Sequence, residues 1–489
     1  MHRSVRSRLH TAFDRRRFEF LLAAAVVATY LLVVLGATGT ARGAGTVCST
    51  WPACETTSWG DDRTIIALTH RFAALVAGTT LAAATAAGFI VDAARRIRLL
   101  LAFAMVAFVV QVGVGAALAV GWESLVAEVH LGLGIAIFVG TLAALTWTLE
   151  PEGGPSGVST AEPDADAPIA ASAASDTAPS VDEHPSTITS ESVPRFDRVR
   201  AYVELTKPRL MWLVCLLAVA GMALAATTGA RIDPVVAVVT VLGGALAIGA
   251  SGTFNHLFER DRDSRMDRTA DRPVATGGVS TIGAVIFGIA LCLLSLGLFL
   301  AFVNRLAAVL TVFAVGYYSV VYTVVLKPNT RWNTVIGGLA GAMPAPIGWA
   351  AVTGDIGLPA VVLAGIVFLW TPAHFYNLAL AYEDDYRRGG YPMLPIVAGR
   401  TTTRRRILGY LGATLLATAV LGALVPALGV GYAVAATVVG AIFLAAVIEL
   451  SRTRTRDAAM RAFHASNAYL GVVLLAVVVD GLVLGAVVP

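Results

Sequence analysis

The chain has 489 residues, of which 57% are hydrophobic and 14% are charged. This composition excludes an ordinary soluble enzyme, because soluble domains carry about 25% charged residues, and it predicts an integral membrane protein. The formal net charge of +4 is small and gives no indication of a nucleic-acid partner.

Apolar stretches long enough to cross a bilayer recur along the whole chain, and a spanning helix needs about 20 residues. We predict an all-α polytopic membrane protein with about 13 transmembrane helices, arranged as four helices followed by nine. The predicted spans are residues 19–39, 64–92, 99–120, 126–148, 211–228, 234–254, 281–303, 306–326, 333–352, 357–381, 407–427, 430–450 and 465–487. With a cytoplasmic N-terminus, nearly all Lys and Arg residues lie on the inner side, which predicts this orientation in the cell (plasma) membrane.

Residues 1–148 form the first predicted domain, and two of its helices carry histidines at similar depth, His70 and His130. Neutral imidazole ligates haem iron well, so the pair predicts a shared haem, although a lone membrane histidine is more often simply packed and hydrogen-bonded. Arg71 would then meet a haem propionate. Cys48 and Cys54 lie in the first outer loop, where the oxidising side of the membrane permits a disulfide.

Residues 149–194 differ from the rest of the chain because they hold nine acidic residues, no Lys or Arg, and many Ala, Ser, Pro and Thr residues. Such a segment cannot bury enough apolar surface to order itself. We predict a disordered acidic linker that joins the first domain to a nine-helix domain at residues 195–489.

The segment from Asn255 to Pro273 carries five carboxylates between two apolar spans. Asn255, Glu259 and Asp263 are spaced by four residues and therefore share one helical face. Oxygen ligands on one face can hold a divalent cation such as Mg²⁺. The alternative is a solvated, positive-inside loop, but such a loop needs arginines and has no use for regularly spaced acids.

Other charged groups are predicted on the same inner side of the membrane. Asp384 and Asp385 follow the tenth span, and the two lysines of the chain, Lys207 and Lys327, each precede a proline at the interface. Two carboxylate groups can hold Mg²⁺ ions that bridge a diphosphate, while basic side chains bind its oxygens. The pattern predicts chemistry on a lipid diphosphate whose tail lies in the bundle and whose head lies at the interface.

Two motifs make residues 195–487 resemble the protohaem IX farnesyltransferases (haem O synthases) of the intramembrane prenyltransferase superfamily. The first is Asn-x3-Glu-Arg-Asp-x-Asp-x2-Met-x-Arg-Thr-x2-Arg-Pro, starting at Asn255. The second is Trp-x-Pro-x-His-Phe, starting at Trp370, followed by Asp-Tyr-x5-Pro-Met-Leu-Pro, starting at Asp385. The second motif distinguishes the haem branch from the quinone branches.

The resemblance implies transfer of farnesyl from farnesyl diphosphate to a vinyl group of protohaem IX (haem b), with water added, giving haem o for terminal oxidases. It implies Mg²⁺ as cofactor. The implied metal ligands are Asn255, Glu259, Asp263, Asp384 and Asp385, and all of these except Asp384 are the implied catalytic residues. The implied phosphate or propionate contacts are Lys207, Arg268, Arg272 and Lys327. His374 is a candidate haem contact, and the alternative is a histidine that anchors a helix end at the interface. The second acidic cluster has fewer carboxylates than in quinone prenyltransferases, so the resemblance is compatible with either one or two bound metal ions.

Residues 1–148 resemble one four-helix half of the haem A synthases, through Gly36-Ala-x-Gly39-x-x-Arg42, the Cys48–Cys54 loop, His70-Arg71 and His130. The resemblance implies that His70 and His130 bind haem b. The catalytic half of that family carries a glutamate three residues before its first histidine, where this chain has Ala67. It therefore implies haem binding or a supporting role, with a separate haem A synthase or a second copy as a candidate partner.

Two other classes of function fit parts of the pattern. One is prenylation of a quinone or an archaeal lipid precursor, against which His374 and the N-terminal histidines argue. The other is a non-catalytic haem carrier or a transporter. Transporters place ionisable groups near the bilayer midplane, whereas the acids here gather at the inner interface.

Overall fold

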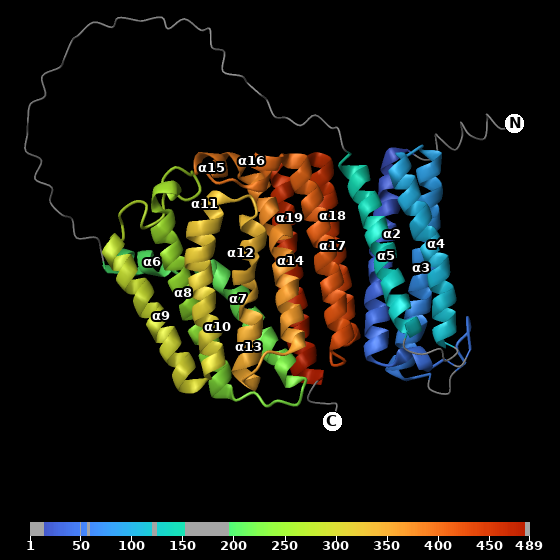
Figure 1. The fold of residues 1–489 in the computed structure, drawn as a ribbon, viewed down its shortest axis with the longest axis horizontal. Coiled ribbons are helices and arrows are strands. Elements are labelled where there is room, and N and C mark those ends of the chain that lie inside the picture. The colour runs from blue at the N-terminus through green and yellow to red at the C-terminus, as the bar shows by residue number, and fades with distance from the viewer. Residues whose placement is uncertain (1–13, 49, 56–58, 120–124, 152–194, 485–489) are drawn as a thin grey trace, which may run out of the picture.

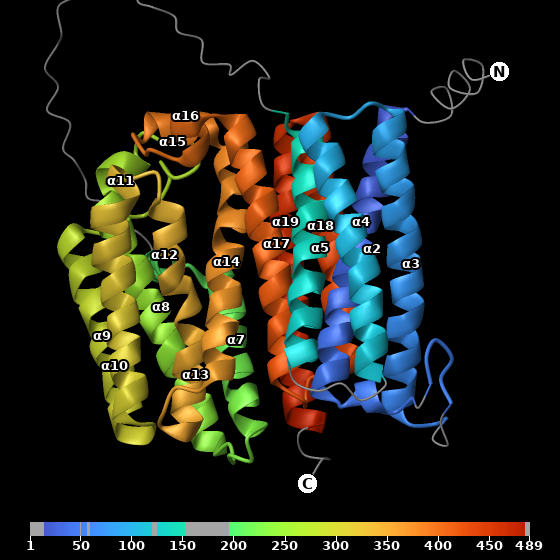
Figure 2. The same ribbon diagram turned by 45° about the vertical axis from the view of Figure 1, so that its right-hand side comes forward.

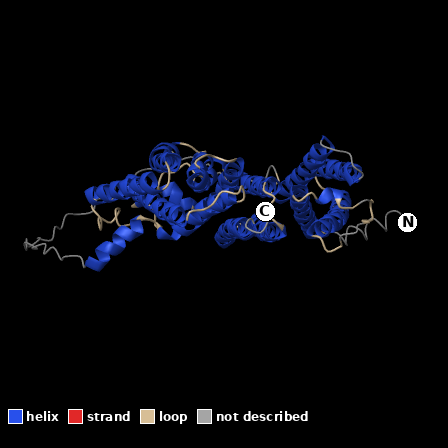
Figure 3. Ribbon diagram, turned by 90° about the horizontal axis from the view of Figure 1, so that it is seen from below, coloured by secondary structure: helices blue, strands red, loops and turns tan. Residues whose placement is uncertain are grey.

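The computed structural model describes residues 14–48, 50–55, 59–119, 125–151 and 195–484, and the regular elements in these ranges are all helical. Thirteen helices among them are long and apolar enough to cross a membrane, which confirms the predicted number. They form two bundles that stand side by side (Figure 1, Figure 3). From residue 152 onward, the predicted linker lies outside the described ranges.

The N-terminal bundle consists of α2 (Arg15–Ala41), η1 (Ala44–Thr46), α3 (Asp62–Ile90), α4 (Arg95–Ala119) and α5 (Leu125–Leu149). Helix α2 packs against α3 and α5, and α4 packs against the same two helices. In this arrangement α3 and α5 lie on one diagonal of the bundle, and α2 and α4 lie on the other.

The C-terminal bundle follows residue 195. Its elements are α6 (Arg195–Leu205), α7 (Pro208–Ala226), α8 (Pro234–Asp263), α9 (Thr281–Phe302), α10 (Arg305–Gly316), η2 (Tyr317–Leu326), α11 (Lys327–Asn329), α12 (Asn333–Ala342), α13 (Pro344–Thr353), α14 (Leu358–Ala381), α15 (Glu383–Arg388), α16 (Leu394–Ala398), α17 (Arg400–Leu424), α18 (Val430–Thr453), α19 (Arg456–Val479) and η3 (Asp480–Leu484). The short helices α11, α15 and α16 gather at one end of this bundle, called here the α15 end (Figure 2).

Short polar side chains begin several spans by accepting a hydrogen bond from an otherwise unpaired backbone N–H. Asp61 caps α3, Asp233 caps α8 just before Pro234, and Thr455 caps α19. Asn304 caps α10 and separates it from α9, although only two residues lie between these helices. The short gap therefore holds a true helical hairpin.

Helices α7 and α13 cross at backbone contact. A Cβ atom added to Gly348 would lie 2.0 Å from the carbonyl oxygen of Ala218, and one added to Gly221 would lie 2.2 Å from that of Ala345. The obstacle is backbone in both cases, so the helices themselves would have to separate. Small residues at helix crossings allow this approach in membranes.

We expect Gly348→Ala to destabilise the protein by about 2–3 kcal/mol, as overpacking of a closed contact does. The measurement is the midpoint of thermal unfolding of the purified protein. Gly341→Ala is the matched control, because no atom lies within 4 Å of a Cβ at that position. The control should be neutral or slightly stabilising, and equal midpoints for the two variants would refute the backbone contact.

The two bundles meet where α2 and α5 pack against α17 and α18. At one edge of this interface the carboxylate of Glu150 pairs with Arg404, including a contact of 2.9 Å. Both residues are buried, with Glu150 0% and Arg404 4% exposed. Arg405 Nε also donates to the Glu150 carbonyl oxygen at 2.8 Å. Packing and a buried ion pair therefore hold the bundles together.

Candidate active site

The last turns of α8 carry three buried polar side chains on one face. Asn255, Glu259 and Asp263 are 2%, 3% and 2% exposed. Helical spacing by four residues puts them in one row facing the bundle. Asp261 lies between them in sequence but on the other side of the helix, where its side chain is 77% exposed and pairs with Arg260. The helix therefore separates buried acids from solvated ones within one charged segment.

Three cations from separate elements meet this row. Lys207, which precedes α7 with a positive φ of 55°, donates to Oδ1 of Asn255. Lys327 at the start of α11 pairs with Glu259. Arg272, in the loop after α8, donates to Asp263 at 2.7 Å and lies 3.8 Å from Glu259. The structure thus brings together six of the residues predicted from the sequence.

The cluster holds more positive than negative charge, with three cations around two carboxylates. Burial, together with the nearby guanidinium of Arg272, lowers the pKa of Lys207 to about 7, although Glu259 acts in the opposite direction. Desolvation and like charges both disfavour an ammonium group. An anion that binds here would relieve this excess, and a diphosphate supplies the required charge.

The π-helical stretch η2 packs against α8 and contributes two side chains, Tyr318 and Thr323, to the buried cluster. Thr323 donates to the carbonyl of Tyr318, five residues earlier, and accepts from Nδ2 of Asn255 at 3.2 Å. The hydroxyl of Tyr318 lies 3.5 Å from Nζ of Lys207. Wider π turns are frequent at functional sites. Sequence reasoning missed Tyr318 and Thr323, because apolar periodicity does not distinguish a π turn from an α turn.

Asp385 on α15 binds the loop that follows α8. Its carboxylate accepts from the backbone N–H groups of Asp267 and Arg268, both at 3.2 Å, and pairs with Arg388. Asp385 is 6% exposed. The second acidic cluster is therefore joined to the first through the loop 264–273, whose Arg272 reaches Asp263.

Asp384 does not join the buried acids. Its side chain is 76% exposed and pairs with Arg387 at 2.8 Å, because neighbouring residues on a helix point in different directions. The structure therefore favours Asp385 over Asp384 as a ligand. Glu383, which sequence reasoning overlooked, is 8% exposed and pairs with Arg400 at 2.6 Å.

His374 lies in α14 between two aromatic rings. Its ring is stacked on Trp370 and on Phe463, with centroid distances of 4.2 Å to each, and Nδ1 is 2.6 Å from the hydroxyl of Ser466. Both faces of the imidazole are covered, so a haem contact would have to use the ring edge. Packing of α14 against α19 accounts for the contacts that the structure shows.

The donor atoms of the α8 row suit Mg²⁺. Among the described residues, no group of three His, Cys, Asp or Glu side chains is already assembled around one point. Mg²⁺ usually takes one or two carboxylates and completes its shell with water and substrate phosphates. Glu259 and Asp263 meet that requirement, since both are buried oxygen donors at the same site.

The N-terminal bundle brings His70 on α3 and His130 on α5 together across its diagonal, with ring centroids 6.3 Å apart. Both Nδ1 atoms are buried and have no hydrogen-bond partner among the residues that the structure describes. The facing positions on the other diagonal are glycines: a Cβ at Gly36 would lie 3.2 Å from His70, and one at Gly115 would lie 3.0 Å from His130. The missing side chains at these glycines allow the two rings to pack closely against α2 and α4.

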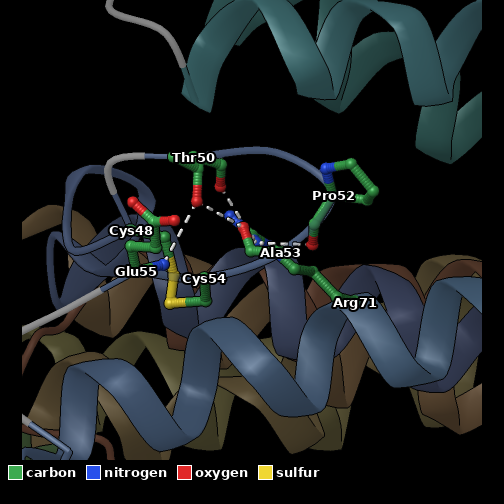
Figure 4. Close-up of a disulfide and its surroundings, with 7 residues drawn as sticks. All are labelled: Cys48, Thr50, Pro52, Ala53, Cys54, Glu55 and Arg71. Atoms are coloured by element: carbon green, nitrogen blue, oxygen red, sulfur yellow. Dashed lines mark hydrogen bonds between the residues drawn. A yellow bond between two sulfur atoms is a disulfide. The ribbon is translucent and has the colours of Figure 1, made fainter.

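A disulfide joins Cys48 to Cys54 in the loop between α2 and α3 (Figure 4). The guanidinium of Arg71 donates to three carbonyl oxygens of the loop, those of Thr50 at 3.3 Å, Pro52 at 2.9 Å and Ala53 at 2.6 Å. These carbonyls satisfy the intramembrane cation that sequence reasoning had paired with a propionate. Arg71 therefore anchors the disulfide loop to α3.

Comparison with known proteins shows the family of this chain. Residues 214–471 match the model of the UbiA prenyltransferase family. A protoheme IX farnesyltransferase from Haloarcula marismortui is 48% identical over 96% of this chain and 100% of its own length. Protoheme IX farnesyltransferase 1 from Natronomonas pharaonis is 49% identical over 95% of this chain and 98% of its own.

Among solved structures, a digeranylgeranylglyceryl phosphate synthase is similar with a TM-score of 0.49 and 17% identity, covering 58% of this chain and 99% of its own. The family match covers more than half of this chain, and the two relatives extend over nearly all of it. The chain therefore belongs to the UbiA prenyltransferase family, among relatives named protoheme IX farnesyltransferase.

Proposed function

We propose that this chain transfers the farnesyl group of farnesyl diphosphate to a vinyl group of protohaem IX. The observation that carries the proposal is the near-full-length similarity to relatives named for this activity. The C–O bond to diphosphate breaks, a C–C bond forms at the terminal vinyl carbon, and water adds to the other vinyl carbon with loss of a proton. The products are haem o and diphosphate.

The buried cluster suits departure of the diphosphate. Lys207, Lys327 and Arg272 converge from three elements and would hold its oxygens, since charge-assisted bonds to phosphate are strong in a low-dielectric site. Glu259 and Asp263, together with Asn255 and Asp385 as further ligands, would hold Mg²⁺, which supplies further charge neutralisation of the leaving group. When the diphosphate binds, these lysine and arginine side chains would exchange their present partners on α8 for the oxygens of the diphosphate.

The test is an assay of the purified protein with haem b, farnesyl diphosphate and Mg²⁺. We expect a more hydrophobic haem whose mass has increased by one farnesyl group and one hydroxyl group. Parallel reactions offer an aromatic acid or glyceryl phosphate as acceptor, which separates this activity from that of quinone or lipid prenyltransferases. Prenylation of those acceptors without a haem product would refute the proposal.

The N-terminal bundle is proposed to bind haem between His70 and His130. Two imidazoles that ligate one iron from opposite sides, each with a metal–nitrogen distance of about 2 Å, have ring centroids on the order of 6 Å apart. The observed 6.3 Å agrees with that spacing, and Gly36 and Gly115 let the two imidazole rings lie close against α2 and α4. Since Ala67 replaces the glutamate of the haem A synthases, the bundle would bind haem without oxidising it.

We expect His70→Ala and His130→Ala each to abolish the Soret band of haem bound in this bundle, because removing one axial ligand breaks the bis-histidine site. The measurement is the absorption spectrum of purified protein titrated with haem b. His464→Ala is the control, since this histidine is exposed on α19. A Soret band that survives both replacements with unchanged position would exclude the site.

The α15 end is proposed to face the cytoplasm, with the protein in the cell membrane and its N-terminus inside. The excess of Lys and Arg in the predicted inner segments supports this orientation. In the same arrangement, the disulfide loop faces the outside. A separate haem A synthase or a second copy is the proposed partner of the N-terminal bundle.

A further inference from the structure

A cavity of about 660 Å³ lies at the α15 end, between the ends of α14 and α18 and the beginnings of α17 and α19. This volume is within the range of roughly 300–1,000 Å³ that is usual for small-molecule sites. Its lining is highly charged. Six arginines border it, Arg268, Arg388, Arg400, Arg404, Arg454 and Arg456, together with four acidic residues, Asp267, Glu383, Asp384 and Asp385.

Four of these arginines already have carboxylate partners. Arg388 pairs with Asp267 and Asp385, and Arg400 pairs with Glu383. Arg404 and Arg454 share Glu150, at the end of the N-terminal bundle. Arg268 and Arg456 differ, because neither forms an ion pair with a carboxylate of the described residues. The uncompensated charge of the cavity is therefore concentrated in these two side chains.

Arg268 and Arg456 both stack on the ring of Tyr382. Their guanidinium carbons lie 5.4 Å and 4.8 Å from its centroid, although one arginine comes from the loop after α8 and the other from α19. A cation–π contact uses the flat face of a guanidinium. The N–H groups at its edge remain available for bidentate binding of a carboxylate. Tyr382 thus holds two anion-binding groups at one place.

The cavity adjoins the diphosphate site through a short loop. The backbone N–H of Arg268 donates to Asp385, and four residues later Arg272 reaches Asp263. Leu380, Ala381 and Leu450 add an apolar portion to the lining. The lining therefore offers contacts both for the anionic groups and for an apolar part of one ligand.

We propose that the cavity binds a dianion with two separate carboxylates, and that these are the two propionates of the haem acceptor. This inference rests on the proposed function for the identity of the acceptor. Arg268 and Arg456 each bind one propionate, and Tyr382 orients both arginines. Arg456 and Tyr382 lie outside both sequence motifs, and this arrangement gives each of them a role in binding the acceptor.

The test is a fluorescence titration of the full-length protein, in nanodiscs of zwitterionic lipid, with metal-free protoporphyrin IX and with its dimethyl ester. Arg456→Gln should weaken binding of the diacid about tenfold, as expected for loss of one charge-assisted contact. Binding of the diester should stay unchanged. Arg461→Gln is the matched control, because Arg461 lies on the same helix but pairs with Glu449 at the surface. The comparison of the two variants cancels any porphyrin held by the N-terminal bundle.

Equal effects of Arg456→Gln on diacid and diester, or no effect on either, would overturn the proposal. The proposal would also be overturned if Arg456→Gln weakened binding of inorganic phosphate or of phosphatidylglycerol nanodiscs but left porphyrin binding unchanged. The titration requires no turnover, so it is independent of the assay for farnesyl transfer. If haem is farnesylated with the same KM in the wild type and in Arg456→Gln, the propionate site is refuted but the proposed reaction is not. If porphyrin binding depends on Arg456 but haem is not farnesylated, the proposed reaction is refuted and the porphyrin site is retained.

Discussion

Asp263→Asn and Asp385→Asn are each expected to lower turnover at least a hundredfold. Asparagine keeps the size of the side chain but removes the charge that a divalent cation needs. A metal-stabilised leaving group accounts for several kcal/mol of transition-state energy, and about 2.7 kcal/mol corresponds to a hundredfold change in rate. The measurement is kcat for haem farnesylation at saturating substrates.

Asp261→Asn is the matched control for this loss. It lies two residues from Asp263 in the same charged segment, but its side chain points to solvent and pairs with Arg260. We expect it to retain nearly full turnover. Thermal unfolding of all three variants separates a catalytic defect from a folding defect. Turnover within threefold of wild type in both Asp263→Asn and Asp385→Asn would rule out their role as metal ligands.

Glu150→Gln is expected to destabilise the protein by about 3–5 kcal/mol, because it leaves the buried guanidinium of Arg404 without its counter-charge. The two side chains are only 1% and 5% exposed, so water cannot replace the lost partner. The measurement is the midpoint of thermal or denaturant unfolding of the intact chain. Glu150 directly follows α5 and Arg404 lies on α17, so we also expect the two bundles to separate more readily, which limited proteolysis would detect.

Glu449→Gln provides the control, because Glu449 pairs with Arg461 at the surface, with side chains 46% and 52% exposed. Exposed pairs contribute about 0–1 kcal/mol. The double variant Glu150→Met with Arg404→Met removes both buried charges and should recover much of the stability. If Glu150→Gln and Glu449→Gln unfold at the same midpoint, the buried pair does not stabilise the junction.

Hydropathy predicted the membrane spans well because the bilayer imposes length and composition on every crossing helix. The row of Asn255, Glu259 and Asp263 was also predictable, since spacing by four residues is enough to place side chains on one helical face. These two signals are local in sequence. They gave the all-helical fold and one half of the candidate site.

Contacts between residues far apart in the chain could not be predicted from the sequence. Nothing in the pattern shows that Glu150 meets Arg404 across 254 residues, or that Tyr382 collects arginines from two distant segments. The choice between Asp384 and Asp385 depended on how a single turn of α15 is rotated, which short helices leave open. Arg71 was assigned to a propionate because a buried cation needs a partner, and the partner proved to be the disulfide loop.

The measurement that tests the central claim most directly is the mass of the haems extracted from host cells with and without this protein. Expression of the intact chain in a host that makes haem b and farnesyl diphosphate, but lacks its own farnesyltransferase, should produce a haem that is heavier than haem b by one farnesyl group and one hydroxyl group. The Asp263→Asn variant at equal expression should produce haem b alone. An unchanged haem profile with the folded wild-type protein would contradict the account.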